Sequence, residues 1–336
     1  MWFLVRRCIF KLRTTSYELR TNVNIIFFGS SQFAVPSLEA ILDKGHTVSC
    51  VVTRPDRKKD RGMHFKPMPV KLVAQNRKLK IYQPQDVNSQ EAVELLGKIK
   101  PDLFVVIAYG KFLSQELLEL PKILSINLHA SLLPIYRGAA PINWAMINGE
   151  EVTGVSVIKM TREMDAGPII SQKKTVISAD EDALQLEQRL SRLGAELLLD
   201  VIEDLSLNNH KLIEQDSQKV SFAPKIKKGN GQINWSAKSR QVFNLVRGVA
   251  GWPGAFTYYK GKLLKIYKAS VSDALYQKQD VLPGEVLDIS KEGLVVNTGS
   301  GALVILQLQP EGKRVMSAQE FISGHKISPG EILGKK

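Results

Sequence analysis

The spacing of hydrophobic positions predicts an α/β fold for the first half of the chain. Residues 24–29 and 48–53 are short apolar runs of the kind that forms buried parallel strands. Between them, residues 33–44 place apolar side chains at helical spacing, and Gly45 follows where a glycine commonly ends a helix. A strand, a helix and a second strand in this order indicate the beginning of a parallel sheet.

Further runs extend this sheet and predict a doubly wound, Rossmann-like domain. We expect strands at residues 102–108, 123–128, 152–160 and 168–177, and a long helix over residues 180–207. The loop after the first strand reads Ser-Ser-Gln-Phe, so the glycine fingerprint of dinucleotide-binding proteins is absent. The sequence therefore disfavours a nucleotide-dependent dehydrogenase, and we expect the active residues beyond the carboxyl ends of the strands.

The second half of the chain has a different pattern of apolar and polar residues. Residues 208–220 are polar and predict a linker, so the first domain should span residues 23–207. Over residues 221–336, short β-like runs alternate with Gly, Pro, Asp and Lys, which predicts a small OB-like β-barrel. The expected strands of this second domain cover residues 255–259, 263–267, 293–298 and 302–308.

The N-terminal stretch differs from both domains. Residues 1–22 contain five basic residues and one acidic residue, and large apolar side chains are interleaved with the charges. An Arg-rich, acid-poor, amphipathic start is typical of an organellar transit peptide. We therefore expect a transit peptide that directs the protein to an organelle; a basic arm without a targeting role is the alternative.

Composition argues against several classes of site. With two cysteines in 336 residues, neither a disulfide framework nor a cysteine-based zinc site is expected. No two of the five histidines have metal-ligand spacing. No apolar run approaches the roughly 20 residues that a membrane-spanning helix needs. We therefore expect no metal and no membrane partner.

The positive charge is concentrated in two segments. The formal net charge of the chain is +13. Residues 53–80 carry ten basic and two acidic side chains, and residues 208–268 carry twelve basic and two acidic ones. Residues 81–207 between them carry eleven basic and eighteen acidic side chains. Such clustering indicates a surface that binds a polyanion; two solvated basic faces are the alternative.

Three polar residues near the strand ends can carry chemistry. Asn127 and His129 are two apart at the end of a predicted strand, so their side chains leave the same face, and Asp165 follows in a Gly/Pro loop. The amide and imidazole could stabilise the oxyanion of an acyl transfer, while the carboxylate orients the imidazole or takes up a proton through water. Taken singly, Asn127 would be interpreted as a cap of the strand end and His129 as a half-buried histidine whose hydrogen bonds are satisfied. Asp165 alone would be interpreted as a turn residue.

A longer motif surrounds these residues. The string from Asn127 to Pro141, followed by the Met-Asp-x-Gly loop at Asp165, resembles the signature of folate-dependent formyltransferases. The resemblance implies that Asn127, His129 and Asp165 are catalytic and that 10-formyltetrahydrofolate is the formyl donor. The residues that it implies as folate contacts are Tyr109, Gly110, Ser131, Leu132, Leu133 and Pro134.

From residue 24 to residue 333, the chain is most similar to the methionyl-tRNA branch of this family, in its mitochondrial form. Residues 53–62 resemble the loop that enters the tRNA acceptor arm, although Lys58-Lys59-Asp60 replaces the small residues and proline usual in bacteria. The implied partner is initiator methionyl-tRNA. The residues implied to bind it are Arg57, Lys58, Lys59, Arg61, Lys225, Lys227 and Lys228.

The expected function is therefore formylation of methionyl-tRNA for translation initiation in mitochondria, by a monomer in the matrix. Two alternatives stay open at this point. One is a formyltransferase that acts on a small amine, and the other is a non-catalytic RNA-binding protein on the same fold.

Overall fold

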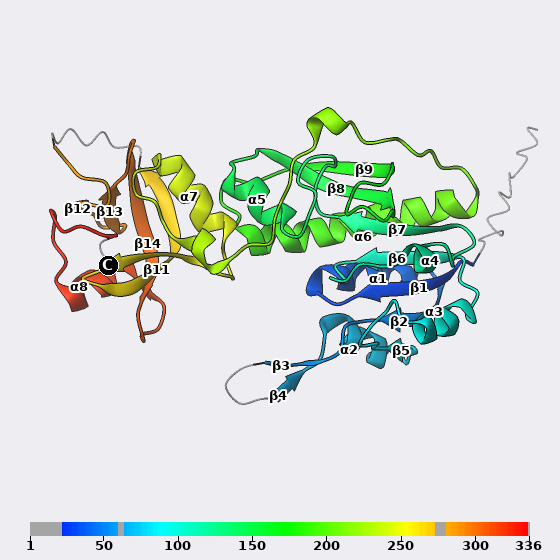
Figure 1. Ribbon diagram of the computed structural model, residues 1–336. Helices are drawn as coiled ribbons and strands as arrows, with labels where there is room; N and C mark the ends of the chain where they lie inside the picture. The colour runs from blue at the N-terminus through cyan, green and yellow to red at the C-terminus, as the bar shows by residue number, and fades with distance from the viewer. Residues whose placement is uncertain (1–21, 60–63, 273–279, 335–336) are drawn as a thin grey trace, which may run out of the picture.

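The structure, a computed structural model, describes residues 22–59, 64–272 and 280–334 and forms an elongated arrangement of two domains (Figure 1). The expected transit peptide, except for Asn22, lies outside the described residues, as does Arg61. The described parts include both predicted domains and the segment between them.

The N-terminal domain is built on a seven-stranded sheet with the order β5-β2-β1-β6-β7-β8-β9. The strands from β5 to β7 run parallel, whereas β8 and β9 are antiparallel to their neighbours. The expected α/β fold is thus confirmed, with an antiparallel extension at one edge. The strands are β1 (Asn24–Gly29), β2 (Thr47–Val52), β5 (Ile81–Tyr82), β6 (Leu103–Ile107), β7 (Leu124–His129), β8 (Val152–Lys159) and β9 (Ile169–Val176).

Helices cover both faces of this sheet (Figure 1). In β1, Ile25 and Phe27 are buried in one apolar layer, and Ile26 and Phe28 are buried in the other. Successive side chains of a strand point to opposite faces, so an uninterrupted apolar strand needs two covering layers. The first layer contains α1 (Val35–Asp43), α2 (Pro69–Asn76) and α6 (Ala183–Ser206), and the second contains α3 (Gln90–Gly97) and α4 (Gln115–Leu118).

The carboxyl ends of the central strands meet at one edge of the sheet. β1 pairs with β6 so that Gly29 lies beside Ile107, and β6 pairs with β7 so that Val106 lies beside Asn127. His129 is the last residue of β7. The loops that leave these ends therefore surround a common space, as expected for an open parallel sheet.

Several short elements were not predicted from the sequence. The helices α2 and α3 have eight residues each, α4 has four and β5 has two, which is too short for a clear periodic pattern. The hairpin of β3 (Arg57–Lys59) and β4 (His64–Lys66), which projects from the domain (Figure 1), was not predicted either. Helix α5 (Pro141–Ile147), in contrast, begins where the sequence predicts a helix, at Pro141.

The segment between the domains is bound to the N-terminal domain along its length. Ile213 exchanges two backbone hydrogen bonds with Ile169 of β9, at 2.8 and 2.9 Å. Arg137 donates its backbone N–H to Ser221 O at 2.8 Å and accepts one from Ala223 N at 2.7 Å. The polar segment that predicts a linker is therefore exposed at the surface and hydrogen-bonded to the N-terminal domain at these points.

The C-terminal domain contains the antiparallel β-structure expected from its short apolar runs. Its strand order is β10-β11-β14-β13-β12, with β15 on β14, and among the described strands β10 and β12 form the two edges. Trp235, Leu264, Leu303 and Phe321 lie in its core. The elements are α7 (Ser239–Gly248), β10 (Ala255–Tyr259), β11 (Lys262–Ser272), β12 (Val286–Ile289), β13 (Leu294–Asn297), β14 (Ala302–Pro310), β15 (Met316–Ser317) and α8 (Ala318–His325).

Helix α7 connects the two domains. It packs against α5, and its Arg247 donates from Nη1 to three backbone oxygens in the loop before α6, at 3.0 to 3.1 Å. The accepting residues are Ser178, Ala179 and Glu181. A guanidinium that satisfies three carbonyls at once fixes this loop to the C-terminal domain.

Candidate active site

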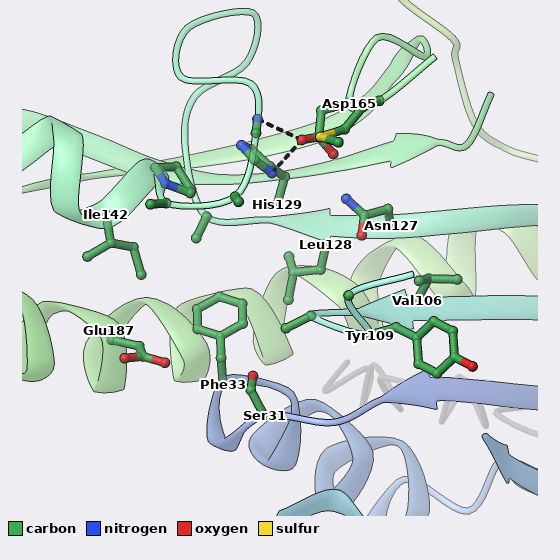
Figure 2. A pocket seen from close by; sticks show the side chains of 18 of the residues that line it. Ser31, Phe33, Val106, Tyr109, Asn127, Leu128, His129, Ile142, Asp165 and Glu187 are labelled. Carbon is green, nitrogen blue, oxygen red and sulfur yellow. Dashed lines mark hydrogen bonds and ion pairs between the residues drawn. The ribbon is translucent and has the colours of Figure 1, made fainter. Parts of the chain in front are cut away.

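A cavity of about 710 Å³ opens at the carboxyl edge of the sheet. Its walls come from the ends of β6 and β7 and from the loop between β8 and β9, and Ala250 and Trp252 of the C-terminal domain complete them. Asn127, His129 and Asp165, the three residues expected to be catalytic, all line this cavity (Figure 2). The structure therefore brings them together in a space that both domains share.

Alternation along β7 aims two of these side chains into the cavity. Asn127 and His129 project from the same side of the strand (Figure 2), as their two-residue spacing predicts. Leu128 between them packs against α6, where Gly194 leaves it room: a Cβ on Gly194 would lie 2.6 Å from Leu128 Cδ2. The close approach of α6 thus supports the strand that carries the amide and the imidazole.

The imidazole of His129 is buried between two acceptors. Its Nε2 lies 2.9 Å from the backbone oxygen of Tyr136, and its Nδ1 lies 3.6 Å from Oδ2 of Asp165. A carbonyl oxygen only accepts, so Nε2 carries the hydrogen of the first contact. Nδ1 is then the nitrogen that faces the carboxylate and can exchange a proton with groups in the cavity.

Backbone geometry fixes the carboxylate of Asp165. Its Oδ2 accepts a hydrogen bond from Gly138 N at 2.8 Å, and its own φ of +53° places it in the left-handed region. Gly138 has a φ of +122°, and a Cβ there would lie 2.7 Å from Ala223 O. Only a glycine can therefore present this N–H to the carboxylate without displacing the neighbouring chain.

Two of the residues implied to bind the folate line the cavity. They are Tyr109 and Gly110. The Tyr109 hydroxyl and Arg54 Nε are buried without a hydrogen-bond partner in the described chain, and the Arg54 guanidinium lies beside Gly110. Burial raises the pKa of Tyr109 to about 12, so its hydroxyl remains a donor at neutral pH. Tyr109 and Gly110 line the cavity, whereas these two donor atoms are shielded from solvent and Arg54 is not part of the cavity wall.

The other residues implied to bind the folate form a turn that is not part of the cavity wall. Ser131 Oγ donates to a backbone oxygen four residues later at 2.6 Å, and Ser156 Oγ both accepts from Leu133 N and donates to Ser131 O. These polar groups are therefore satisfied within the fold, and their contact with folate stays a prediction. The residues concerned are Ser131, Leu132, Leu133 and Pro134.

Two cavity residues were not singled out from the sequence. Glu187 of α6 lines the cavity beside apolar side chains, and burial raises the pKa of its carboxyl. No hydrogen bond or ion pair connects the Glu187 carboxylate to any described residue. Trp252 also lines the cavity and is 58% exposed, and an exposed indole can stack on a nucleotide base. Neither position forms a motif, so only the folded chain shows that both face the site.

The basic residues implied to bind tRNA lie on two surfaces. Arg57–Lys59 form β3, one strand of the projecting hairpin (Figure 1), and Arg61 lies outside the described residues. Lys225, Lys227 and Lys228 are exposed where the chain passes between the domains, and none forms an ion pair within the described chain. Their charge is therefore available to a polyanion.

Metal-ligand clusters, membrane-spanning helices and reactive thiols are not found among the described residues. Among them, no group of three or more His, Cys, Asp or Glu side chains could hold a metal ion, and no helix is long and apolar enough to cross a membrane. Cys50 is buried and unpaired, and burial raises its pKa to about 11, so its thiol is a poor nucleophile.

Known proteins match both domains. Residues 22–202 match the formyl transferase family model, and residues 225–326 match the formyl transferase C-terminal domain. Methionyl-tRNA formyltransferase of Geobacter metallireducens is 43% identical over 312 residues, 93% of this chain and 99% of that protein. The same enzyme of Citrifermentans bemidjiense is 42% identical over 316 residues, 94% and 98% of the two chains. Among solved structures, the sugar 3N-formyltransferase WlaRD, crystallised with dTDP and 5-N-formyl-THF, aligns at a TM-score of 0.64 with 20% identity, over 87% of this chain and 99% of that one.

The α/β domain, its cavity and the two matched models define this protein as a formyltransferase, an enzyme that transfers a formyl group. Within this class, the bacterial relatives that are 42–43% identical over nearly their whole length are methionyl-tRNA formyltransferases. The chain belongs to the methionyl-tRNA formyltransferase family.

Replacing Glu187 by glutamine should change how stability depends on pH. Burial raises the pKa of this carboxyl in the folded state, so its ionisation destabilises the fold as pH rises from the unfolded-state pKa through the folded-state pKa. Glu187→Gln should therefore melt at a higher temperature than wild type near pH ~7.5, and the difference should disappear near pH ~4. Thermal unfolding across this range measures the effect. The exposed Glu203→Gln on the same helix is the control, and an equal Tm difference at both pH values would contradict the assignment.

Proposed function

We propose that this protein transfers the formyl group of 10-formyltetrahydrofolate to the α-amino group of initiator methionyl-tRNA, giving N-formylmethionyl-tRNA. The observation that carries the proposal is the convergence of Asn127, His129 and Asp165 on one cavity in a chain of this family. The relatives are methionyl-tRNA formyltransferases, and a solved neighbour was crystallised with a formyl-folate. Both substrates follow from these names.

The reaction joins the amine nitrogen to the formyl carbon and breaks the bond between that carbon and N10 of the folate. The carbonyl oxygen becomes anionic in the tetrahedral intermediate, and the Asn127 amide and His129 Nδ1 are the donors that stabilise it. Asp165, facing Nδ1, stabilises the charged imidazole and takes up the proton of the amine through water. N10 receives a proton as it leaves, so the reaction is balanced without a covalent enzyme intermediate.

The two substrates enter from opposite sides in this proposal. Tyr109 and Glu187 lie on different sides of His129 (Figure 2). The folate occupies the side of Tyr109 and Gly110, the two cavity residues that the family motif implies as folate contacts. The aminoacyl end of the tRNA occupies the side bounded by Trp252, where the C-terminal domain contributes to the cavity. This division explains why a second domain is part of the site.

The basic surfaces hold the RNA. The β3–β4 hairpin approaches the acceptor end, with Arg57 as its principal contact, because a guanidinium can pair with phosphate in two places. Lys225, Lys227 and Lys228 hold the RNA backbone between the domains, and their exposure supports this role. A small amine needs no such surface, so the charge distribution favours the tRNA substrate.

The subcellular localisation of the protein is proposed from its first residues. The five basic residues and single acidic residue of residues 1–22 support a transit peptide, and we place the enzyme in the mitochondrial matrix, where it acts as a monomer in translation initiation.

Removing a catalytic side chain should reduce turnover far more than folate binding. His129→Ala and Asp165→Asn should each lower kcat by about 10²–10³-fold, because each removes stabilisation of a charge that develops only during the reaction. Transfer of labelled formyl groups to charged tRNA measures kcat, and fluorescence titration measures folate affinity. Asp200→Asn, an exposed residue of α6, is the matched control. A His129 or Asp165 variant with near-normal kcat would remove that residue from the mechanism.

Weakening the basic surfaces should reduce tRNA affinity and its dependence on salt. Arg57→Ala should impair productive engagement of charged tRNA without changing folate affinity. Replacing Lys225, Lys227 and Lys228 by alanine should lower the slope of log affinity against log salt by about one unit per lost phosphate contact. Lys98→Ala, exposed at the end of α3, is the control. Affinity that does not respond to salt would instead favour a small-molecule amine.

Deleting the N-terminal stretch should affect location and not catalysis. A chain beginning at Val23 should be soluble and fully active in vitro, because β1 begins at Asn24. The same chain, fused to a fluorescent protein, should stay out of mitochondria, whereas the full chain should enter them. Normal import of the shortened chain into mitochondria would overturn the proposed targeting role of residues 1–22.

A further inference from the structure

The proton-handling pair of the active site is connected to the segment between the two domains. We infer that Gln215 and Ser221 of this segment are positioning residues for the reaction: Gln215 sets Asp165, and Ser221 sets His129 through Tyr136. The inference rests on the proposed roles of His129 and Asp165, and it assigns a catalytic purpose to a stretch whose sequence predicts only a linker.

Gln215 connects the Asp165 loop to Arg137 through both ends of its side-chain amide. Its Nε2 donates to Asp165 O at 2.8 Å and to Gly167 O at 2.7 Å, so both hydrogens of the amide are used on the same loop. Its Oε1 accepts from Nε and Nη2 of Arg137, at 3.0 and 2.8 Å. Arg137 is largely buried, so this amide is held from one side while it holds the loop on the other.

This arrangement matters because Asp165 is in a strained conformation. A non-glycine residue with a φ of +53° keeps that conformation only when its surroundings impose it. Gln215 binds the peptide oxygen of this very residue, and Gly138 N binds its carboxylate. Without the amide, the loop loses two of the contacts that keep the carboxylate facing His129 Nδ1, and only the bond from Gly138 N to the carboxylate remains of those described here.

Ser221 acts on the other member of the pair. Its Oγ accepts from Tyr136 N at 2.9 Å, and the backbone oxygen of Tyr136 is the acceptor of His129 Nε2. Tyr136 also has a positive φ, of +61°, so its peptide groups depend on such partners for their direction. Ser221 therefore helps to set where the histidine's acceptor lies: its hydroxyl holds one peptide group of Tyr136, and its backbone oxygen accepts from Arg137 N in the other. Ser221 itself does not line the substrate cavity.

Gln215→Glu keeps the contact of this side chain with Arg137 and removes its contact with the Asp165 loop. The new carboxylate still pairs with Arg137, but it places an oxygen opposite the carbonyls of Asp165 and Gly167 and repels the loop. We expect kcat to fall by about 10–10²-fold, the scale of a displacement of about 1 Å at a reacting group. The Michaelis constants for folate and tRNA should stay within about twofold of wild type, because neither binding surface changes.

The decisive measurement is a double-mutant cycle. If Gln215 acts through Asp165, then Gln215→Glu should cost less than about twofold in kcat when Asp165 is already replaced by asparagine. Equal losses in both backgrounds, or a Gln215→Glu enzyme within about twofold of wild-type kcat, would overturn the inference. If Asp165→Asn alone has normal turnover, the proposed mechanism fails instead, so the two failures are distinguishable.

Further variants separate positioning from folding. Ser221→Ala should lower kcat with unchanged Michaelis constants, and Gln215→Met, which removes the hydrogen bonds without adding charge, should reproduce the loss seen for Gln215→Glu. Gln218→Glu and Ser217→Ala make the same chemical changes at exposed positions of the same segment and should be neutral. Unfolding of both Gln215 variants, detected by circular dichroism, would assign the segment to stability alone and reject the inference.

Discussion

The structure depends on holding an imidazole and a carboxylate 3.6 Å apart when they come from different connections of the sheet. His129 ends β7, whereas Asp165 belongs to the loop that joins β8 and β9, so this loop must fold back over the sheet edge. The loop approaches β8 so closely at Gly167 that there is no space for a side chain at this position: a Cβ on Gly167 would lie 1.8 Å from Lys159 O. A glycine at this point and a left-handed residue at Asp165 are the conformational conditions for the pair to meet.

Most of the groups that orient this pair are backbone atoms. Tyr136 O faces His129 Nε2, and Gly138 N faces the Asp165 carboxylate. Such groups keep their direction when charge develops in the cavity, so the protein does not have to reorganise during the reaction. The side chains of the segment between the domains hold this backbone in turn. The geometry of the proposed catalytic pair therefore depends on residues beyond the strand ends that do not line the cavity.

The sequence predicted what depends on local pattern. Strict alternation along an apolar strand placed Asn127 and His129 on one face, and the long helix and main strands were found within a few residues of their bounds. It could not reveal Gln215, because a glutamine in a polar stretch has no periodicity, and its four hydrogen bonds exist only after distant segments meet. Glu187 was hidden for a related reason: helical spacing shows a polar face but not the cavity that this face meets.

The C-terminal domain affects the cavity even where it does not line it. Arg247 holds the backbone of residues 178–181, directly before the first turns of α6, and those turns carry Leu184 and Glu187 into the cavity wall. Ser221 and Trp252 also lie beyond the α/β domain, one behind His129 and one in the wall. Removing everything after residue 220 would therefore disturb the histidine, the cavity wall and the proposed RNA surface together. Loss of activity in such a fragment would not report on substrate size alone, because the domain that carries the proposed RNA contacts also completes the site.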